Sequence, residues 1–111
     1  MALATKYRLK NAKDIERVVR HGRTIKGIFC LIRFLKNDLV NSRCTIIISQ
    51  KILKRAVDRN KTRRRITEVI QPLMPRLAPC DIMIIVTQSI LEKGFDEIKS
   101  DLEQNIKKIT V

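Results

Sequence analysis

The segment from residue 54 to residue 68 reads Lys-Arg-Ala-Val-Asp-Arg-Asn-Lys-Thr-Arg-Arg-Arg-Ile-Thr-Glu. Residues 51–65 contain eight lysines or arginines and one acid, so they carry +7 of the net charge of +13. No Gly or Pro interrupts this segment, and Arg, Lys and Ala all favour a helix. After it, apolar residues recur with helical spacing up to Leu73, which is typical of a stripe facing a core. The sequence therefore predicts one helix from about Lys54 to Leu73, cationic in its first half and buried in its second.

Like charges are crowded along this predicted helix. Arg59 and Arg63 lie four residues apart, and neighbouring like charges on a helix repel by a few tenths of a kcal/mol per pair. A polyphosphate backbone would neutralise them. Asn60, between these arginines, can donate to and accept from a ribose or a base edge. The pattern favours an RNA contact, and a solvated basic face without a partner is the alternative.

Length and composition bound the class of protein. A chain of 111 residues with 44% apolar residues is expected to form one globular domain with a modest core. Only 4% of the residues are aromatic, which weakens any model of single-stranded RNA stacking on rings. The positive charge predicts affinity for nucleic acid or for an anionic membrane surface. No apolar run approaches the ~20 residues of a membrane span, so we expect a cytoplasmic protein without a membrane partner.

The charge is unevenly distributed. Residues 66–111 carry a net charge of −2, so the anionic partner is expected to contact the N-terminal two-thirds of the chain. Residues 1–10 hold three cations and are predicted to form a basic, flexible arm.

Residues suited to catalysis or metal binding are sparse. Cys30, Cys44 and Cys80 are widely separated and lie in apolar runs, which predicts small buried side chains in a reducing compartment. The single His21 has no recognisable partner, and the aspartates lie in separate predicted elements. We therefore expect neither a catalytic residue nor a metal site within the protein.

The remaining elements follow in order along the chain. Asn11 is a suitable N-cap for a short helix, and Gly22 fits a left-handed residue at its end. Residues 28–35 are predicted to form a strand, with earlier pairing around residues 24–26. Residues 43–49 are predicted to form the next strand, antiparallel to the previous one.

The last third of the chain completes the predicted fold. Residues 81–87 form an apolar run typical of a central strand, and a final amphipathic helix follows Gly94. The fold class is therefore α/β (α+β sandwich-like), a mixed sheet of about four strands with helices packed on it, in the order α-β-β-β-α-β-α. The strand–helix–strand unit through the basic helix implies a parallel pair, for which a right-handed crossover is the general rule.

The basic helix resembles the signature helix of the bacterial ribonuclease P protein subunit. The shared pattern is Ala56, Val57, Arg59, Asn60, Arg63, Arg64 and Glu68. Residues 49–51, Ser-Gln-Lys, and the opening from Arg8 to Gly22 resemble the same family. Ile52 and Leu53 stand where the family usually has Gly, in a linker that is one residue longer.

This resemblance implies a left-handed crossover and a function. In this family the RNA subunit is the catalyst and uses magnesium, and the protein alone is inactive. The protein binds the ribonuclease P RNA and the 5′ leader of precursor tRNA, and it assists the endonucleolytic removal of that leader. A monomeric protein bound 1:1 to the RNA is therefore expected, with magnesium bound mainly by the RNA.

The resemblance also assigns site residues in this chain. The expected RNA contacts are Lys51, Lys54, Arg55, Arg59, Asn60, Lys61, Arg63 and Arg64. The expected lining of the leader cleft is Ile15, Val19, Ile32 and Arg33. Three of these are aliphatic where the family often has aromatic residues, which removes base stacking of roughly 1–3 kcal/mol per base. Alternatively, Ile15 and Val19 only pack their helix on the sheet.

Two rival functions remain open from the sequence. A structural RNA-binding protein of ribosomal type would explain the charge and the fold equally well. A nonspecific duplex-DNA binder is a weaker third possibility, which competition between RNA and DNA would separate because 2′-hydroxyl contacts exist only on RNA.

Overall fold

The structure is a computed structural model that describes residues 3–109. Its elements are η1 Thr5–Tyr7, α1 Ala12–His21, β1 Arg23–Lys26, β2 Cys30–Lys36, β3 Arg43–Ile47, α2 Ala56–Ile70, η2 Gln71–Arg76, β4 Cys80–Val86 and α3 Phe95–Ile106. The predicted order of helices and strands is confirmed, with two short 3-10 helices added.

The four strands form one mixed sheet in the order β1-β2-β4-β3. β1 and β4 both pair antiparallel with β2, whereas β3 pairs parallel with β4. The strand predicted at residues 43–49 does run opposite to β2, but the two are not neighbours, because β4 is inserted between them. Six of the seven β4 residues are buried, as predicted for a central strand covered on both faces.

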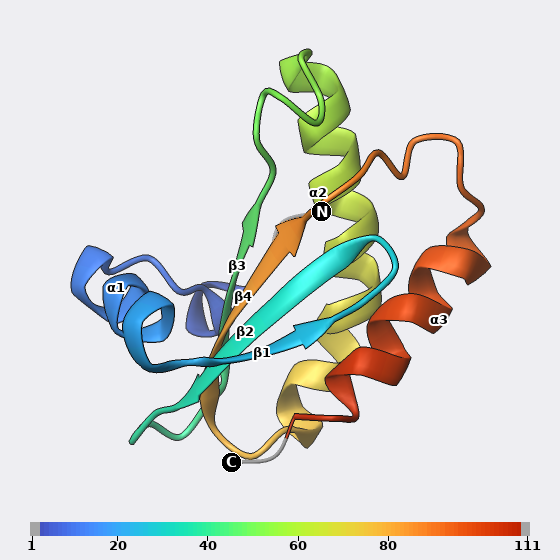
Figure 1. The fold of residues 1–111 in the computed structure, drawn as a ribbon. Helices are drawn as coiled ribbons and strands as arrows, with labels where there is room; N and C mark the ends of the chain where they lie inside the picture. Colours follow the sequence, from blue (N-terminus) through green and yellow to red (C-terminus); the bar gives the residue numbers. More distant parts are fainter. Residues whose placement is uncertain (1–2, 110–111) are drawn as a thin grey trace.

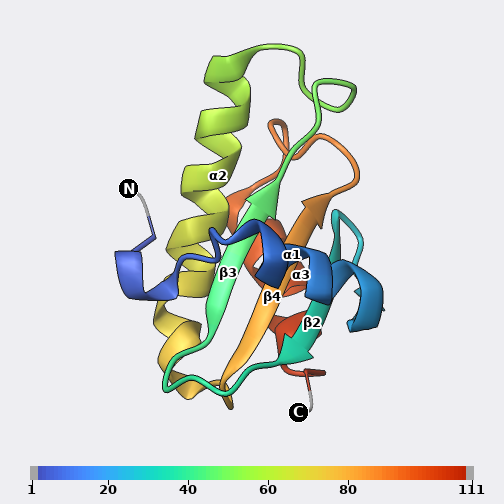
Figure 2. The ribbon, with the colours of Figure 1, turned by 90° about the vertical axis from the view of Figure 1, so that its left-hand side faces the viewer.

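Helices cover both faces of this sheet. α1 packs on one face, and α2 and α3 pack side by side on the other (Figure 1). In Figure 2 the chain runs up β3, returns through α2 behind the sheet and runs up β4 to the right of β3. This path is a left-handed crossover, as the family resemblance implied and against the general preference.

The alternation of side chains across the strands divides the core in two. A large cluster lies between the sheet and the pair α2 and α3, and it includes Ile32 and Ile84. A small cluster under α1 is formed by Leu9, Val18 and Met83. Successive residues of a strand point to opposite faces, so β4 contributes Ile82 and Ile84 to the large cluster and Met83 and Ile85 to the small one.

The helix α2 is shorter than the sequence predicted. It begins at Ala56 and ends at Ile70, and the chain continues as the 3-10 helix η2. Pro72 has no backbone N–H to donate to the preceding turn, and Pro75 follows within η2. Leu73 still packs against the core, so the apolar spacing was informative beyond the point where the α-helix stops.

The residues at the two ends of α1 are Asn11 and Gly22. The Asn11 side chain accepts a hydrogen bond from the Lys13 backbone N–H at 2.8 Å, which confirms the predicted N-cap. Gly22 was expected in a left-handed conformation, but its φ of −71° and ψ of 160° are extended. A Cβ atom at Gly22 would lie 2.4 Å from the Val18 carbonyl oxygen, so the glycine is required for close approach and not for its φ angle.

The basic segment at the N-terminus is packed against the domain and does not stand apart from it. Leu3, Tyr7 and Leu9 are buried, and the Leu9 N–H donates to the Cys44 carbonyl at 3.0 Å. This bond places residues 8–9 beside β3 as a short parallel bridge. The prediction of a flexible arm over residues 1–10 counted the cations and overlooked these apolar residues; residues 1–2 lie outside the described range.

Candidate nucleic-acid interface

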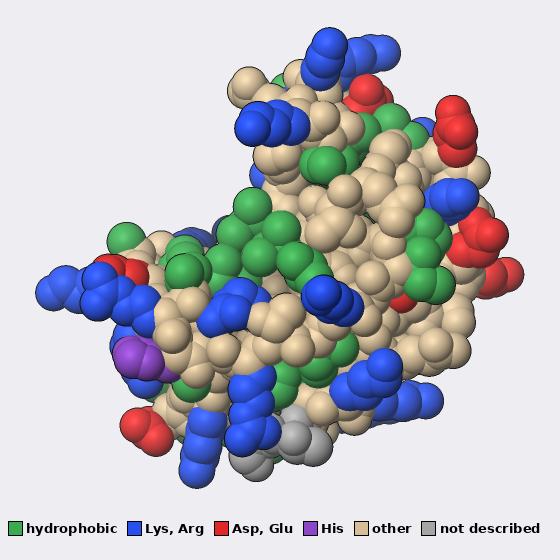
Figure 3. Space-filling model, in the orientation of Figure 1, with side chains coloured by type: hydrophobic (Ala, Val, Ile, Leu, Met, Phe, Trp, Pro, Cys, Tyr) green, Lys and Arg blue, Asp and Glu red, His purple; other side chains and the backbone are tan. Residues whose placement is uncertain are grey.

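The outer face of α2 carries most of the residues predicted to contact RNA. Asn60, Lys61 and Arg64 are exposed, and Arg63 is half-buried beside them. Opposite them on the same helix, Thr62 and Ile66 are buried. In the loop before α2, the cations Lys51, Lys54 and Arg55 are all exposed. Figure 3 shows Lys and Arg side chains gathered at the upper end of the molecule, where this loop and the first turns of α2 lie.

Few of these charges are neutralised inside the protein. Among the described residues, the one ion pair formed by a cation of residues 51–65 joins Arg55 Nε to Asp58 Oδ2 at 3.9 Å. That distance is at the limit of an ion pair, and the Arg55 side chain is well exposed. Glu68 lies four residues after Arg64 on the same helix, but the two form no ion pair in the described chain. Apart from the weak pair of Arg55 with Asp58, the cations of residues 51–65 have no carboxylate partner among the described residues.

Two arginines of residues 51–65 form hydrogen bonds with backbone carbonyls of the protein itself. Arg59 Nη1 donates to the carbonyls of Leu53 and Lys54, both at 2.9 Å, and so fixes the loop that leads into α2. Arg65 Nη1 donates to the Ile90 carbonyl at 3.2 Å and anchors the segment between β4 and α3. Arg59, predicted only as an RNA contact, therefore has a structural role as well.

The unusual linker before α2 has a defined geometry. The backbone N–H groups of Ile52 and Leu53 both donate to the Ser49 carbonyl, at 3.2 and 3.1 Å. Leu53 is buried and Ile52 packs against the large cluster. The two apolar residues thus anchor the loop, and its cations are left facing solvent.

The predicted leader-cleft residues do not share one surface. Ile32 is only 1% exposed and lies in the large cluster under α2 and α3, so its assignment to the cleft was wrong. Ile32 and Arg33 are adjacent in β2 and must point to opposite faces. Ile15 packs against the small cluster under α1, whereas Val19 is 51% exposed beside it.

Arg33 caps the C-terminal end of α1. Its Nη2 donates to the carbonyls of Val18, Val19 and Gly22 at 3.1, 2.6 and 3.0 Å. Its Nη1 donates to Thr24 Oγ1 at 2.7 Å. A cation at the negative end of a helix dipole stabilises the helix, so the contacts of Arg33 are structural.

An apolar row crosses the sheet on the α1 face. Leu31 of β2 is opposite Ile85 of β4, which is opposite Ile47 of β3. Ile47 is exposed, and Leu31 and Ile85 are half-buried. Figure 3 shows apolar side chains in the hollow between α1 and the upper end of the molecule, with Lys and Arg on both sides. Sequence reasoning missed this row because it depends on the pairing of three strands.

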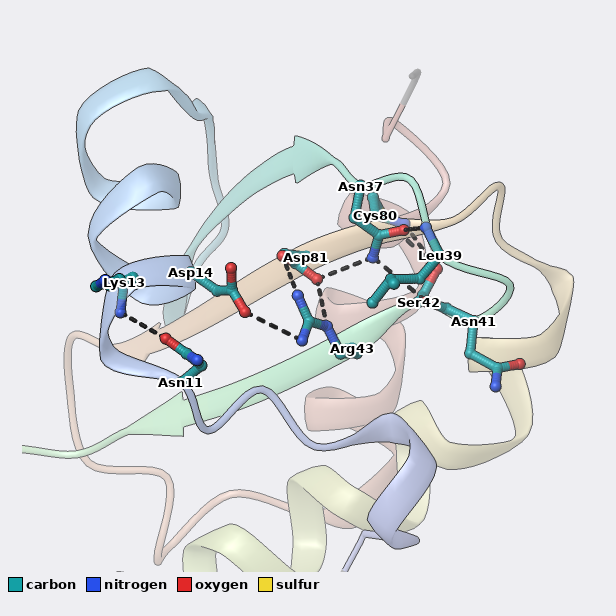
Figure 4. Close-up of polar contacts among 10 residues, drawn as sticks. All are labelled: Asn11, Lys13, Asp14, Asn37, Leu39, Asn41, Ser42, Arg43, Cys80 and Asp81. Carbon is teal, nitrogen blue, oxygen red and sulfur yellow. Dashed lines mark hydrogen bonds and ion pairs between the residues drawn. The ribbon is translucent and has the colours of Figure 1, made fainter.

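A buried polar cluster fixes α1 to the sheet. Arg43 donates from Nε and Nη2 to the two carboxylate oxygens of Asp81, at 2.9 and 2.8 Å, and from Nη1 to Asp14 at 3.2 Å (Figure 4). Asn37 also donates to Asp81, at 2.9 Å. The hydrogen bond with Asp81 raises the pKa of Arg43 above its usual value, against the opposing effect of burial. The two aspartates belong to different elements, and only the tertiary structure brings them to one arginine.

The cysteines are small buried side chains, as predicted. All three are free and buried. Burial raises the pKa of the Cys30 thiol to about 12 and also raises the pKa of Cys44 and of Cys80. Such thiols remain protonated and unreactive near neutral pH.

Two features of residues 3–109 concern metal ions and membranes. Nowhere in this range do three His, Cys, Asp or Glu side chains gather as potential metal ligands. No helix in the same range is long and apolar enough to cross a membrane.

Comparison with known proteins decides the family. The model of the family described as Ribonuclease P matches residues 3–110. The chain belongs to the ribonuclease P protein family.

Individual members agree with this assignment. The ribonuclease P protein component of Roseiflexus castenholzii is 30% identical over 107 residues, covering 95% of this chain and 87% of the relative. The component from Synechocystis sp. is 32% identical over 106 residues, covering 94% and 86%. The structure of a mutant RNase P protein from Staphylococcus aureus superposes with a TM-score of 0.83 at 26% identity, covering 92% of this chain and 86% of that one.

Family membership indicates what kind of partner the cationic helix could bind. Ribonuclease P protein components are subunits of an RNA-processing endoribonuclease of the tRNA-processing class, which implies an RNA partner for this chain. The predicted family and fold class are therefore confirmed. The residue-level RNA contacts remain predictions.

Proposed function

We propose that this chain binds the catalytic RNA of ribonuclease P through the outer face of α2 and the loop before it. The observation that carries the proposal is the cationic face of residues 51–65, whose one carboxylate contact among the described residues is the weak pair of Arg55 with Asp58. A phosphate backbone would supply the missing negative charge and release bound counterions. Asn60 and Lys61 extend the donor surface on the same side of the helix.

We further propose that the 5′ leader of precursor tRNA passes over the α1 face of the sheet. The row of Leu31, Ile85 and Ile47 would form the floor, and Val19 one wall. Aliphatic side chains can cover a nucleobase but lack the stacking energy of a ring. This proposal replaces two predicted residues: Ile32, which points to the opposite face, and Arg33, whose guanidinium is bound to the carbonyls at the end of α1.

In this proposal the RNA carries out the chemistry with magnesium that it binds itself. Asp14 and Asp81 lie close together and both bind the Arg43 guanidinium. Because this positive charge already lies between the two carboxylates, a magnesium ion is disfavoured there. The protein would neutralise phosphates, bind the leader and so lower the magnesium concentration that cleavage requires. It would act as a monomer bound 1:1 to the RNA, in the cytoplasm.

Reconstitution tests the function. The full chain is mixed with a bacterial ribonuclease P RNA and precursor tRNA at a magnesium concentration too low for the RNA alone. We expect correct removal of the 5′ leader only when both components are present. Cleavage that never exceeds that of the RNA alone would favour the rival, a structural RNA-binding protein of ribosomal type.

The leader path has its own test. Ile47→Ala should weaken binding of precursor tRNA by the holoenzyme about twofold to fivefold, because it removes apolar contact at the floor. Binding of mature tRNA, which lacks a leader, should be unchanged. Val40→Ala is the matched control, since Val40 is an exposed aliphatic residue in the loop between β2 and β3. Equal losses for precursor and mature tRNA would exclude this floor as the leader path.

A further inference from the structure

A groove of about 650 Å³ lies beside the open edge of β3, between α2 and the N-terminal segment. Its floor is apolar and includes Leu9, Ile46 and Val57. Val57 is 60% exposed although it is aliphatic, and the core does not use it. This volume is in the range of small-molecule sites.

The rim of this groove is cationic. Four cations from α2 and the N-terminal segment line it, and no acid does; the four are Arg8, Lys10, Arg63 and Arg64. Within residues 3–109, the one hydrogen bond that the Arg63 side chain donates goes to the Asn60 side-chain oxygen, at 3.4 Å. An anionic ligand with an apolar part therefore matches the groove in both charge and polarity.

The edge of β3 adds hydrogen-bonding groups to the groove. The Cys44 carbonyl points to this edge, because it accepts from the Leu9 N–H. Alternation along the strand directs the N–H and carbonyl of Ile46 to the same side. Within residues 3–109 these two groups have no partner across the edge, since the bridge to the N-terminal segment ends at Cys44. A flat ligand with its own donor and acceptor can pair with them.

We infer that this groove holds one unstacked nucleotide of the RNA partner. Its base lies on Leu9, Ile46 and Val57, its edge pairs with the Ile46 backbone or the Asn60 amide, and its phosphate contacts Arg63 and Arg64. Proteins bind RNA in this manner at loops and bulges, where bases are free to leave the stack. The inference rests on the proposed RNA-binding function and adds a site that recognises a base and not only phosphate.

The direct test is a titration of the full chain followed by backbone amide NMR. The probes are uridine 5′-monophosphate, adenosine 5′-monophosphate and, as a probe without a base, ribose 5-phosphate. We expect the nucleotides to shift the amides of residues 44–46 and 57–67, and ribose 5-phosphate to shift residues 63–64 alone. Identical shifts from all three probes would reduce the groove to a phosphate site and overturn the inference.

A pair of variants separates the base from the phosphate. Val57→Ser should weaken nucleotide binding about threefold to tenfold and leave ribose 5-phosphate binding unchanged, because it removes apolar contact only. Ile28→Ser is the matched control, since Ile28 is 67% exposed and lies outside the groove. An unchanged nucleotide affinity for Val57→Ser would also overturn the inference.

Binding of the complete ribonuclease P RNA distinguishes failure of this site from failure of the proposed function. If the groove holds a nucleotide, Val57→Ser weakens RNA binding without changing its salt dependence. If only the groove assignment is wrong, Val57→Ser binds as the parent protein does and the double variant Arg63→Gln with Arg64→Gln still loses affinity. If the proposed function is wrong, Val57→Ser and the double arginine variant both bind the RNA as well as the parent protein does, and the parent protein does not stimulate cleavage.

Discussion

Arg43 and the neighbouring arginines Arg63 and Arg64 have opposite surroundings in this fold. Arg43 is largely buried and makes two-oxygen contact with Asp81. Arg63 and Arg64 lie on the outer face of α2, and neither forms an ion pair within the described chain. The difference teaches that arginine content alone does not define a binding surface; what matters is whether the fold supplies the carboxylate.

The helices α2 and α3 repeat this contrast on one face of the sheet. α2 contains five cations and two acids, whereas α3 contains four acids and one cation. Two of the four acids of α3 accept hydrogen bonds from the backbone. Asp101 accepts from the Ile28 and Phe29 backbone N–H groups at 2.8 and 3.0 Å. Glu97 accepts from the Gly94 N–H at the start of the helix. Asp101 and Glu97 of α3 therefore serve the fold, whereas Arg63 and Arg64 of α2 form no ion pair in the described chain and are available to a partner.

The largest expected effect concerns the buried cluster. Arg43→Met should lower the free energy of unfolding by about 3–5 kcal/mol, because it leaves the buried Asp81 carboxylate without its cation. Urea denaturation followed by circular dichroism measures this change. Asp14→Asn is the graded control and should cost less, since Asp14 is more exposed and makes one contact with Arg43. A loss under about 1 kcal/mol for Arg43→Met would break the comparison.

The second effect appears in RNA binding and not in stability. The double variant Arg63→Gln with Arg64→Gln should lose about 2–3 kcal/mol of binding free energy at moderate salt. Its log–log salt slope should fall by up to about 0.9 for each phosphate contact removed. The free energy of unfolding should stay within about 0.5 kcal/mol of the parent value.

A control variant that loses the same charge elsewhere on the protein separates the effect of position from the effect of net charge. Lys107→Gln with Lys108→Gln removes two exposed cations just after α3. We expect this variant to keep the parent salt slope. If its slope falls as far as that of the α2 variant, the RNA responds to net charge and the α2 face is not a specific contact.

Arg59 should show an intermediate, mixed effect. Arg59→Gln removes two hydrogen bonds to the loop before α2, so the free energy of unfolding should fall by about 1–2 kcal/mol. Arg59→Lys keeps the charge but cannot hold both carbonyls in the same way, and it should recover RNA binding more than stability. Thermal denaturation and a binding isotherm on the same samples would separate the structural role of Arg59 from its role in RNA binding. If Arg59→Lys recovered stability but not RNA binding, this assignment of roles would be contradicted.

The smallest effect is expected at an exposed pair. Glu16 Oε1 contacts Arg20 Nη2 at 2.8 Å on α1, and both side chains are more than half exposed. Glu16→Gln should change the free energy of unfolding by less than about 0.5 kcal/mol. A loss as large as that of Arg43→Met in the same urea series would show that burial is not what separates the two classes of ion pair.

Local chemistry made several features predictable. The cap at Asn11, the cationic half of α2 and the central strand β4 each depend on residues close in sequence. The packing of the N-terminal segment was missed because its apolar residues are few and only acquire a partner at β3 and α2. Ile32 was misplaced for a simpler reason, since the alternation of β2 already excluded it from the face of Arg33.

The sequence by itself determined the family, the order of elements and the presence of a cationic helix, because these depend on short-range pattern and composition. Only the tertiary structure decided which arginines remain without a carboxylate. Arg33, Arg43 and Arg65 find their partners 9 to 38 residues away, across strands and loops, and of these three only Arg43 finds carboxylates in the described chain. Such partners cannot be read from spacing along the chain. The contact of Arg43 with Asp81, for example, arises only when β4 enters the sheet beside β3.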